Sequence, residues 1–482
     1  MKNSITFILD GAKKTLEFSP ASGLSPTTTV LNYLRSLPDH RGVKEGCAEG
    51  DCGACTVVIG ELGQDRVLHY RAVDSCLLFL PMLHGKELVT VENLKSPSGD
   101  LHPVQRAMVD SNGSQCGFCT PGIIMSLFAL TQSRPHPTPE EARVALAGNL
   151  CRCTGYRPII DAAIKSSPQN GGVHFGTDGV STVRLLKSIP RTGISIVTRQ
   201  QRYDQPAMLK ECLALVRRFP KAVLVNGATD VALRVTKKFE TLPHVIDLSR
   251  VAELNKISRR SSGLTFGAGV KVNDVMQQSR RDLPALSGML GVFGAEQIRN
   301  VATIGGNIGT ASPIGDILPV LIAYSAKIVL QGKGGKRTVR ADKFATGYRK
   351  TERKPDEIIT AITLPIPSKS LKVQSYKVSK RRDLDIATVS AAFCLDVDDG
   401  GMVKDSILAY GGMAERSKRA EVTERFLKGK PWIRSTVENA QQWIDKDFSP
   451  ISDVRGSAEF RKVVAKNLLL KFWNDTKNGE GE

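Results

Sequence analysis

The chain has 482 residues, of which 41% are hydrophobic and 24% are charged, and it carries a formal net charge of +19. This composition is ordinary for a globular protein, and the length allows about two to four domains that each bury a core. The first residues, MKNSITFILD, hold only a short apolar patch, and no run approaches the roughly 18 apolar residues of a membrane helix. We therefore expect no signal peptide, no membrane span, and a cytoplasmic protein whose thiols stay reduced.

The positive charge is confined to the second part of the chain. Residues 1–165 contain 16 Lys+Arg and 16 Asp+Glu, whereas the remaining residues contain 51 and 32. The basic residues come as scattered pairs such as Arg259 with Arg260 and Arg280 with Arg281, and no motif of a nucleic-acid-binding module is present. We interpret most of these charges as surface charges that favour solubility, and we expect no nucleic acid among the partners.

The N-terminal segment has the pattern of a small α+β unit. SITFILDG and KTLEF read as two short strands around a turn at Asp10 and Gly11, which is a hairpin signal. Apolar residues at helical spacing predict a helix within TTTVLNYLRSL. Hairpin, helix, cysteine loop and the strand TVVIG, in that order, are typical of a ferredoxin-like β-grasp domain.

The cysteine loop has the spacing of a plant-type ferredoxin. Cys47, Cys52 and Cys55 form a C-x4-C-x2-C pattern, and Cys76 follows further along the chain, as in the ligand set of a 2Fe-2S cluster. The glycines between them can adopt positive φ and let backbone N–H groups approach sulfur. Structural zinc usually takes two C-x2-C pairs, or one such pair with two histidines. We therefore predict a 2Fe-2S cluster, with zinc as the alternative.

A helical region with four more cysteines comes next. HPVQRAMVDSN, TPGIIMSLFALTQS, PTPEEARVALAGN and RPIIDAAIKSS each have an apolar face, which predicts four helices. Cys116-x2-Cys119 and Cys151-x-Cys153 lie at the junctions of these helices. Residues one or two apart on a helix point to different faces, so the four thiols can meet only on loops at helix ends. Zinc could occupy such a set, but beside a ferredoxin-type loop we favour a second 2Fe-2S cluster.

A polar segment separates these regions from the rest of the chain. Residues 166–184 are rich in Ser, Gly, Asn and Thr, which predicts a linker and a domain boundary near 170–195. Further on, residues 221–233 (KAVLVNGATDVAL) form an apolar strand that runs into a Gly-containing turn. Such a turn can present backbone N–H groups to a diphosphate, although a plain strand–turn–helix junction has the same pattern.

Residues 294–323 are the most unusual part of the second half. They contain five glycines among Thr, Ser and Asn residues, and the apolar segment ILPVLIAYSA begins within them. A loop of this kind beside an apolar helix suits close approach of the backbone to a phosphate-bearing cofactor. The G-x-G-x-x-G fingerprint is absent, so we do not predict a Rossmann fold.

The C-terminal region reads as a further α+β domain. ITAITLPIP and VSAAFCLDV are strand-like, and SAEFRKVVAKNLLLKFW is helical. Cys212 and Cys394 lie in apolar segments and are predicted to be buried core thiols. Neither H-E-x-x-H nor G-x-S-x-G occurs, so hydrolytic chemistry has no support and we predict no catalytic side chain.

In combination, the motifs KEGCAEGDCGACTV, GSQCGFCTPG, GNLCRCTGYRPI and VATIGGNIGTASPIGD resemble those of the molybdenum hydroxylase (xanthine oxidase) family, over essentially all of residues 1–482. The resemblance is to the iron–sulfur and FAD subunit of the xanthine dehydrogenase type. It implies a multidomain α+β fold. The implied domains are a β-grasp 2Fe-2S ferredoxin domain at 1–95, a helical 2Fe-2S domain at 96–167, a linker at 168–194, a vanillyl-alcohol-oxidase-type FAD domain at 195–368 and a C-terminal α+β flavoprotein domain at 369–482.

The resemblance also implies the cofactor residues. One 2Fe-2S cluster would be bound by Cys47, Cys52, Cys55 and Cys76, and the other by Cys116, Cys119, Cys151 and Cys153. FAD would contact Leu224, Val225, Asn226, Gly227, Ala228, Thr229, Asp230, Val231, Phe293, Thr303, Ile304, Gly305, Gly306, Asn307, Asp316, Ile359 and Lys377. In this family the aromatic ring at Phe293 lies beside the isoalloxazine, and the loop KRRDLDI, residues 380–386, would border the NAD site. The match is loosest at the FAD turn, where Asp230 stands in place of a longer acid.

The activity implied by the resemblance is electron transfer within a xanthine dehydrogenase. A partner molybdopterin subunit would hydroxylate hypoxanthine or xanthine, and electrons would pass through the helical-domain cluster and the ferredoxin-type cluster to FAD and then to NAD. The expected assembly is a heterotetramer of two small and two large subunits. Three alternatives stay open: the equivalent subunit for an aldehyde or another N-heterocycle, a redox sensor that binds nucleic acid, and a zinc-stapled interaction protein.

Overall fold

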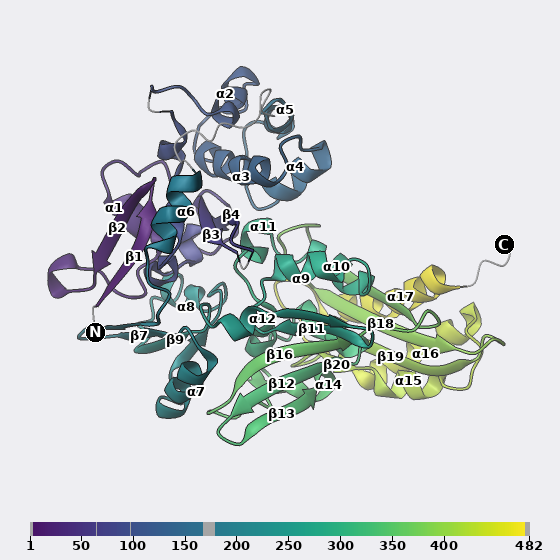
Figure 1. Ribbon diagram of the computed structural model, residues 1–482. Coiled ribbons are helices and arrows are strands. Elements are labelled where there is room, and N and C mark those ends of the chain that lie inside the picture. Colours follow the sequence, from purple (N-terminus) through teal and green to yellow (C-terminus); the bar gives the residue numbers. More distant parts are fainter. Residues whose placement is uncertain (1–2, 64, 97, 167–178, 478–482) are drawn as a thin grey trace. The chain divides into compact units, whose positions relative to one another are not determined.

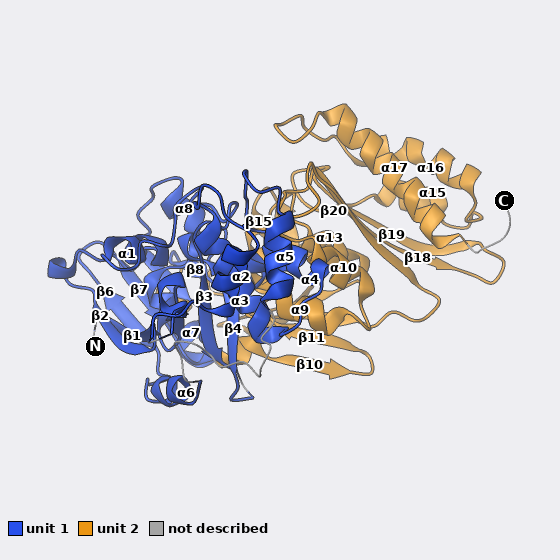
Figure 2. Cartoon of the chain, turned by 90° about the horizontal axis from the view of Figure 1, so that it is seen from above, with its two compact units in different colours: residues 1–215, 221–251, 295–302 blue, residues 216–220, 252–294, 303–482 orange. Residues whose placement is uncertain are grey.

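The computed structural model describes residues 3–63, 65–96, 98–166 and 179–477. They divide into two compact units, which Figure 2 shows in different colours. Unit 1 comprises residues 1–215, 221–251 and 295–302, and unit 2 comprises residues 216–220, 252–294 and 303–482. The FAD domain expected at residues 195–368 therefore contributes to both units.

Unit 1 begins with a five-stranded sheet in the order β2-β1-β5-β3-β4. Its elements are β1 (Ser4–Leu9), β2 (Ala12–Glu17), α1 (Val30–Ser36), β3 (Thr56–Leu62), β4 (Leu68–Asp74) and β5 (Glu87–Val89). The predicted hairpin is confirmed, because Asp10 and Gly11 have φ of 51° and 77°, as a tight two-residue turn requires. Thr29 caps the predicted helix α1 by accepting a hydrogen bond from the backbone N–H of Asn32.

Four helices follow, and all four were predicted from their apolar faces. They are α2 (Pro103–Asp110), α3 (Thr120–Ser133), α4 (Pro139–Leu146) and α5 (Arg157–Lys165). Each has a proline in its first turn, where the missing N–H costs no intrahelical bond. Figure 1 shows them as one group, and their apolar faces share one core in which Leu127 of α3 is fully buried.

The prediction of a linker is wrong for residues 179–187. This segment forms helix α6 (Gly179–Lys187), whereas residues 167–178 of the expected linker lie outside the described residues. Thr182 and Leu186, one helical turn apart, are both buried, and Thr182 donates a 3.4 Å hydrogen bond to Glu87 of β5. Contacts with the sheet thus stabilise a helix whose local composition is that of a linker.

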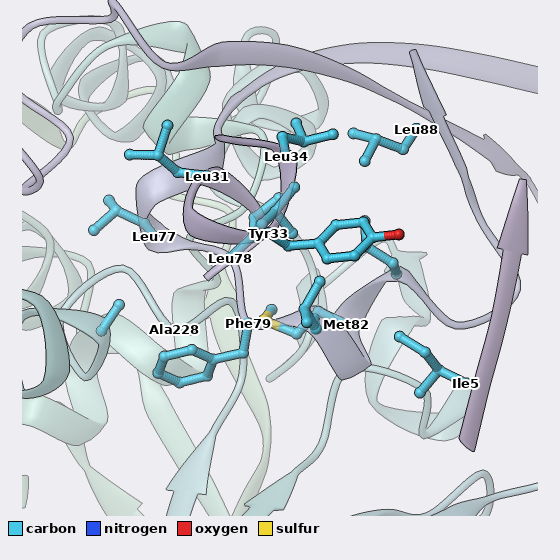
Figure 3. Packing of buried hydrophobic residues seen from close by; sticks show 14 of the residues in the cluster. Ile5, Leu31, Tyr33, Leu34, Leu77, Leu78, Phe79, Met82, Leu88 and Ala228 are labelled. Carbon is cyan, nitrogen blue, oxygen red and sulfur yellow. The ribbon is translucent and has the colours of Figure 1, made fainter. Parts of the chain in front are cut away.

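A second sheet of unit 1 has the order β6-β7-β9-β8. Its elements are β6 (Ile194–Val197), β7 (Arg202–Gln205), β8 (Val223–Val225) and β9 (His244–Asp247), with helices α7 (Leu209–Arg218), α8 (Ala232–Thr236) and the short α11 (Glu296–Arg299). Leu77 and Phe79 of the first sheet region belong to the same buried cluster as Ala228 (Figure 3). Val225 belongs to this cluster too. The β-grasp region and residues 194–247 therefore share one hydrophobic core.

Unit 2 contains a five-stranded antiparallel sheet in the order β10-β11-β16-β12-β13. Its strands are β10 (Ile257–Arg260), β11 (Gly263–Gly267), β12 (Lys327–Gly332), β13 (Gly335–Arg340) and β16 (Ile358–Pro365). The accompanying elements are α9 (Val272–Ser279), α10 (Pro284–Gly291), α12 (Ile304–Thr310), α13 (Ile317–Ala323), α14 (Ala341–Phe344), β14 (Ala345–Gly347) and β15 (Lys350–Thr351).

The glycine-rich stretch was predicted as a loop, but much of it is helix α12. Thr303 caps this helix, since its side chain accepts a 3.1 Å hydrogen bond from the N–H of Gly306. A Cβ on Gly305 would lie 2.5 Å from the Cβ of Ala268. The glycine therefore permits close packing of the helix against the segment after β11, which composition alone does not distinguish from a loop.

The rest of unit 2 is the predicted C-terminal α+β domain, and the multidomain α+β fold class is confirmed. Strands β17 (Lys372–Val378), β18 (Val389–Val397), β19 (Val403–Gly411) and β20 (Lys418–Arg419) pair in that order with helices α15 (Glu421–Leu427), α16 (Arg434–Asp447) and α17 (Ala458–Thr476). Of the two thiols predicted to be buried, Cys212 is fully buried and Cys394 of β18 is half-buried. No helix within the described residues has the length and apolarity to cross a membrane.

Candidate redox cofactor sites

The ferredoxin-type cysteine loop turns at residues with left-handed backbone. Ala48 and Gly50 have φ of 55° and 76°. The chain therefore curls around a sulfur atom, and the backbone N–H groups of Glu49 and Asp51 donate to the Cys47 Sγ at 3.4 and 3.2 Å. Peptide N–H groups directed at one sulfur stabilise a thiolate, as an iron–sulfur site requires.

The four thiols of this loop lie in two pairs. The Sγ atoms of Cys55 and Cys76 are 3.4 Å apart, and a hydrogen bond joins the side chains of Cys47 and Cys52, which lowers the pKa of Cys47 to about 5 and raises the pKa of Cys52. Among the described residues, no three His, Cys, Asp or Glu side chains form a single-ion site. The pairs fit two irons, because each iron of a 2Fe-2S cluster takes two protein ligands.

A buried carboxyl lies beside these thiols, and the sequence analysis missed it. Asp74 is 3% exposed, and its Oδ1 accepts a weak hydrogen bond from the Cys55 Sγ at 3.7 Å. Burial, and then the charge of Cys47, raise the pKa of Asp74 to about 7. Its place at the end of β4, two residues before Cys76, was a signal that could have found it.

The thiols of the helical region lie on loops at helix ends, as predicted. Cys119 is the N-cap residue of α3, where the helix dipole favours negative charge. The thiols again pair, Cys116 with Cys153 and Cys119 with Cys151. The N–H of Phe118 and then the Cys153 thiol lower the pKa of Cys116.

The two quartets differ in exposure. Cys55 and Cys76 are 2% and 1% exposed, whereas Cys116 and Cys153 are exposed. The neighbouring Phe118 is 49% exposed. The ferredoxin-type quartet thus has no exposed thiol, although its other two thiols are only half-buried, whereas two thiols of the helical-region quartet reach the surface of this chain.

A direct hydrogen bond connects the two cysteine loops. The backbone N–H of Leu150, the residue before the C-x-C motif, donates to the carbonyl of Cys52 at 3.0 Å. The Asn149 side chain donates to the carbonyl of Gly53 at 3.0 Å. A Cβ on Gly53 would lie 2.3 Å from the carbonyl oxygen of Gly148, so glycine is required for this approach. The loops are therefore fixed to each other without an intervening side-chain layer.

The first group of residues expected to bind FAD, 224–231, lies in unit 1. Leu224 and Val225 end strand β8, and the following residues form the turn before α8. Gly227 and Ala228 have φ of 90° and 62°, and a Cβ on Gly227 would lie 2.2 Å from the carbonyl oxygen of Val301. A turn with consecutive left-handed residues can direct N–H groups at one anion, so this turn fits a phosphate group.

A buried polar network, which the sequence analysis missed, lies at the same edge of the sheet. Tyr203 Oη and Gln205 Nε2 donate to the Asp247 Oδ2 at 2.8 and 2.6 Å. The next residue, Leu248, donates its N–H to the carbonyl of Val225 at 2.8 Å. Parallel strands end here, which is where open α/β sheets bind ligands. The network fixes the strand end from which the turn expected to bind FAD departs.

The remaining residues expected to bind FAD, Phe293, 303–307, Asp316, Ile359 and Lys377, lie in unit 2. Lys377 Nζ donates to Asp316 Oδ2 at 2.8 Å and to the carbonyl of Val292 at 2.9 Å, with the two charged side chains 4% and 8% exposed. Burial raises the pKa of Asp316, which the Lys377 charge opposes. Its other oxygen, Oδ1, is buried and has no partner among the described residues. An unpaired buried acceptor is costly, so this oxygen fits a donor from a bound molecule.

Two further contacts group the unit 2 residues. Val292, which accepts from Lys377, precedes the half-buried Phe293. Ile359 lies against α12, since its Cδ1 is 3.5 Å from the position of a Cβ on Gly309. The structure thus brings Phe293 close to the Lys377–Asp316 pair, and Ile359 close to the helix of residues 304–310.

The loop expected to border the NAD site folds back on itself. The N–H of Arg381 donates to Asp385 Oδ2 at 2.9 Å, and its guanidinium donates to the carbonyl of Leu384 at 2.8 Å. Lys380 donates to the carbonyl of Val454 at 3.0 Å. These bonds hold a compact basic turn, of the kind that can offer Arg or Lys to phosphate.

Comparison with protein families gives three matches. Residues 90–164 match a [2Fe-2S] binding domain, residues 198–367 match the FAD binding domain in molybdopterin dehydrogenase, and residues 374–476 match the CO dehydrogenase flavoprotein C-terminal domain. Binding domains for a 2Fe-2S cluster and for FAD are therefore present in this chain.

Individual proteins resemble the chain over different extents. Xanthine dehydrogenase/oxidase of Gallus gallus is 33% identical over 546 residues, which cover 98% of this chain and 40% of that protein. The chain thus spans about 40% of the length of the curated relatives that it matches.

Two solved structures are similar to part of the chain. Carbon monoxide dehydrogenase from Hydrogenophaga pseudoflava matches with a TM-score of 0.55 and 28% identity, covering 58% of this chain and 97% of that chain. Quinoline 2-oxidoreductase from Pseudomonas putida 86 matches with a TM-score of 0.53 and 25% identity, covering 57% and 95%.

Proposed function

Since this chain belongs to the molybdenum hydroxylase family and contains iron–sulfur and FAD domains of that family, we propose that it is the electron-transfer subunit of a xanthine dehydrogenase. The observation that carries this proposal is the direct contact of two cysteine loops, each with four thiols in two pairs. A contact through the Leu150 N–H and the Cys52 carbonyl keeps two clusters close without a barrier of side chains.

Each quartet holds one 2Fe-2S cluster in this proposal. Cys47, Cys52, Cys55 and Cys76 bind the ferredoxin-type cluster, and Cys116, Cys119, Cys151 and Cys153 bind the helical-domain cluster. The paired thiols and the N–H groups directed at the Cys47 Sγ support this assignment. When bound, the clusters carry single electrons and FAD exchanges electron pairs.

The residues proposed to contact FAD form two groups, each described within its own unit. In unit 1 the turn at 224–231 receives the diphosphate on its backbone N–H groups, and Gly227 permits the required backbone conformation. In unit 2 the unpaired Oδ1 of Asp316 accepts a hydrogen bond from the cofactor, while Lys377 fixes the other carboxyl oxygen. The half-buried Phe293 borders the isoalloxazine ring, and Thr303 to Asn307 and Ile359 complete the contacts.

A molybdopterin subunit docks on the exposed thiol quartet in this proposal. Cys116 and Cys153 are exposed, and the half-exposed Phe118 offers an apolar contact beside them. The relatives carry more than twice the length of this chain, which leaves room for a molybdenum-binding part in a separate subunit. We propose a heterotetramer of two chains of each kind.

The electron source and acceptor are the finer parts of the proposal. Similarity over 98% of the chain to a xanthine dehydrogenase/oxidase favours hypoxanthine or xanthine as the reductant. The basic turn at 380–386 favours NAD as the acceptor, because its Arg and Lys side chains can pair with a diphosphate. A second candidate is the equivalent subunit for another substrate, which the likeness to carbon monoxide dehydrogenase and quinoline 2-oxidoreductase supports.

A substrate screen on the purified complex tests the proposal. We expect NAD reduction with hypoxanthine or xanthine, and none with carbon monoxide, quinoline or an aldehyde. The chain alone should oxidise none of these compounds but should oxidise NADH with an artificial acceptor. Purine oxidation by the chain alone, or a complex that is active only on another substrate, would contradict the corresponding part of the proposal.

A further inference from the structure

We propose that Gln297 is a positioning residue for the two cysteine loops, and that it acts through Asn149 to set electron transfer between the clusters. This inference rests on the proposed function, because it assumes that both loops carry clusters. Gln297 lies on the four-residue helix α11, between Phe293 and Thr303 in the sequence. Residues 295–302 nevertheless belong to unit 1, together with both cysteine loops.

Gln297 is enclosed by the helical region. Its side chain is 1% exposed. Nε2 lies 2.9 Å from Ser126 Oγ of α3, 3.0 Å from the carbonyl of Ala145 of α4 and 2.9 Å from Asn149 Oδ1. The two N–H donors of this amide are therefore surrounded by three acceptors. The amide nitrogen, and not its oxygen, must face these acceptors. Gly148 makes room for the side chain, since a Cβ there would lie 2.3 Å from Gln297 Oε1.

The orientation of Gln297 fixes the orientation of Asn149. Because Gln297 Nε2 and Ser126 Oγ both donate to Asn149 Oδ1, the Asn149 nitrogen must point the other way. There Nδ2 donates to the carbonyl of Gly53 at 3.0 Å and to Thr56 Oγ1 at 3.2 Å. Gly53 stands between Cys52 and Cys55, and Asn149 stands two residues before Cys151. We call Gln297, Asn149, Ser126 and Gly53 the buried amide network.

The same helix contacts the ferredoxin-type loop directly. A Cβ on Gly50 would lie 2.9 Å from Ile298 Cδ1, and Gly50 lies between Glu49 and Asp51, whose N–H groups donate to Cys47. Asn300 donates to the carbonyl of Ala72 of β4 at 3.0 Å. Helix α11 and the residues beside it therefore contact both cysteine loops. The side chain of Gln297 reaches the loop that contains Cys151.

Substitution of Gln297 has a definite electrostatic consequence. Gln297→Glu places a carboxylate where a donor faced Asn149 Oδ1 and the Ala145 carbonyl, which leaves buried acceptors unpaired. The Asn149 amide is then drawn to turn its nitrogen toward the new carboxylate, and the Gly53 carbonyl loses its donor. Gln297→Met keeps the volume and removes the hydrogen bonds without adding charge.

The test compares three variants in the holoprotein: Gln297→Glu, Gln297→Met and the control Gln105→Met. Gln105 is buried in the same helical region and donates to the carbonyl of Val91, but it contacts neither cysteine loop among the hydrogen bonds described. Iron and FAD content are measured first. The EPR spectra of both clusters and the rate of electron transfer between them after rapid reduction are then recorded.

We expect Gln297→Glu, with iron and FAD retained, to slow transfer between the clusters by about tenfold or more, the scale of effect that loss of positioning produces. Its EPR spectrum should change for the helical-domain cluster, Gln297→Met should show a smaller effect, and Gln105→Met none. If Gln297→Glu fails to retain iron, Gln297→Met decides the outcome. Unchanged spectra and rates in iron-loaded Gln297→Met would overturn the inference, whereas absence of iron or FAD from the unmodified protein would overturn the proposed function instead.

Discussion

The two cysteine loops have the same number of thiols in similar pairs, but their surroundings differ. Cys55 and Cys76 lie in a core that is shared with residues 194–247, and they are at most 2% exposed. Cys116 and Cys153 lie at the surface of this chain. In the proposed relay, the quartet without an exposed thiol shares a core with residues 194–247, which include the turn expected to bind FAD, and the quartet with two exposed thiols faces the partner.

The largest expected effects come from removing one thiol of each quartet. Cys55→Ser and Cys116→Ser should each lower the iron content by about half, because each quartet holds one two-iron cluster in the proposed assignment. Iron analysis and EPR spectra check this, with loss of a different signal in each variant. Cys212→Ser, at a buried thiol outside both quartets, is the control. Loss of both signals in Cys116→Ser would contradict the assignment of two separate clusters.

A pair of glycine variants tests the difference in packing between the loops. Gly53 and Gly117 both have positive φ, 67° and 83°, so an alanine costs about 1–2 kcal/mol at either position. At Gly53 the Cβ would also lie 2.3 Å from a backbone oxygen, whereas at Gly117 no atom lies within 4 Å. Gly53→Ala should therefore cost roughly 3 kcal/mol or more in total.

Thermal unfolding of the two glycine variants, followed by the visible absorbance of the clusters, measures this contrast. Gly53→Ala should lower the transition temperature clearly more than Gly117→Ala. Equal shifts would mean that the ferredoxin-type loop is no more tightly packed than the exposed one.

The sheet of the ferredoxin-type region also contains a buried carboxyl, Glu87, that makes the stability of the protein depend on pH. Burial raises the pKa of Glu87 to about 7, against hydrogen bonds from Tyr70 and Thr182 that lower it. A folded pKa above the unfolded value of 4.5 means that the folded state binds the proton more tightly. Stability should therefore fall as pH rises from about 4.5 to about 7 and level off above.

Glu87→Gln should remove the contribution of Glu87 and leave that of Asp74, whose pKa burial also raises to about 7. The loss of stability between pH 5 and pH 8 should therefore be smaller in the variant by up to about 3 kcal/mol. Denaturation at the two pH values measures the change. Glu17→Gln, an exposed carboxyl on the same sheet, is the control. A variant whose stability still falls between pH 5 and pH 7 to the same degree would show that Glu87 does not cause the effect.

The smallest effect is expected at the exposed loop. Phe118→Ala should weaken binding of the molybdopterin subunit by about tenfold, the scale for truncation of one aromatic interface residue, while cluster and FAD content stay unchanged. Titration of the separated subunits measures the affinity. Phe239→Ala, which removes another exposed aromatic ring, should leave it unchanged. Equal affinities for Phe118→Ala and the unmodified chain would place the partner elsewhere.

The sequence predicted features that depend on local patterns. The four helices within residues 103–165 were predicted because each carries an apolar face. Both thiol quartets were predicted because the spacing of the cysteines is itself the ligand pattern. Helices α6 and α12 were missed because their composition is that of a loop. Their stability comes from packing against Glu87 in one case and Ala268 in the other, which local sequence does not contain.

The sequence could not show contacts between distant residues. Gln297 and Ser126 are 171 residues apart in the chain, and no spacing rule connects them. The division of residues 195–368 between two units was missed for the same reason, because it depends on a core that residues 194–247 share with the β-grasp region. Asp247 became a candidate only when the strand ends were placed.

Iron, zinc and FAD analysis of the holoprotein, combined with an EPR redox titration, tests the central claim most directly. The account predicts about four irons per FAD, no stoichiometric zinc, and two 2Fe-2S signals with separate midpoint potentials. Two irons per FAD with a single signal, or zinc in place of iron at the exposed quartet, would contradict it.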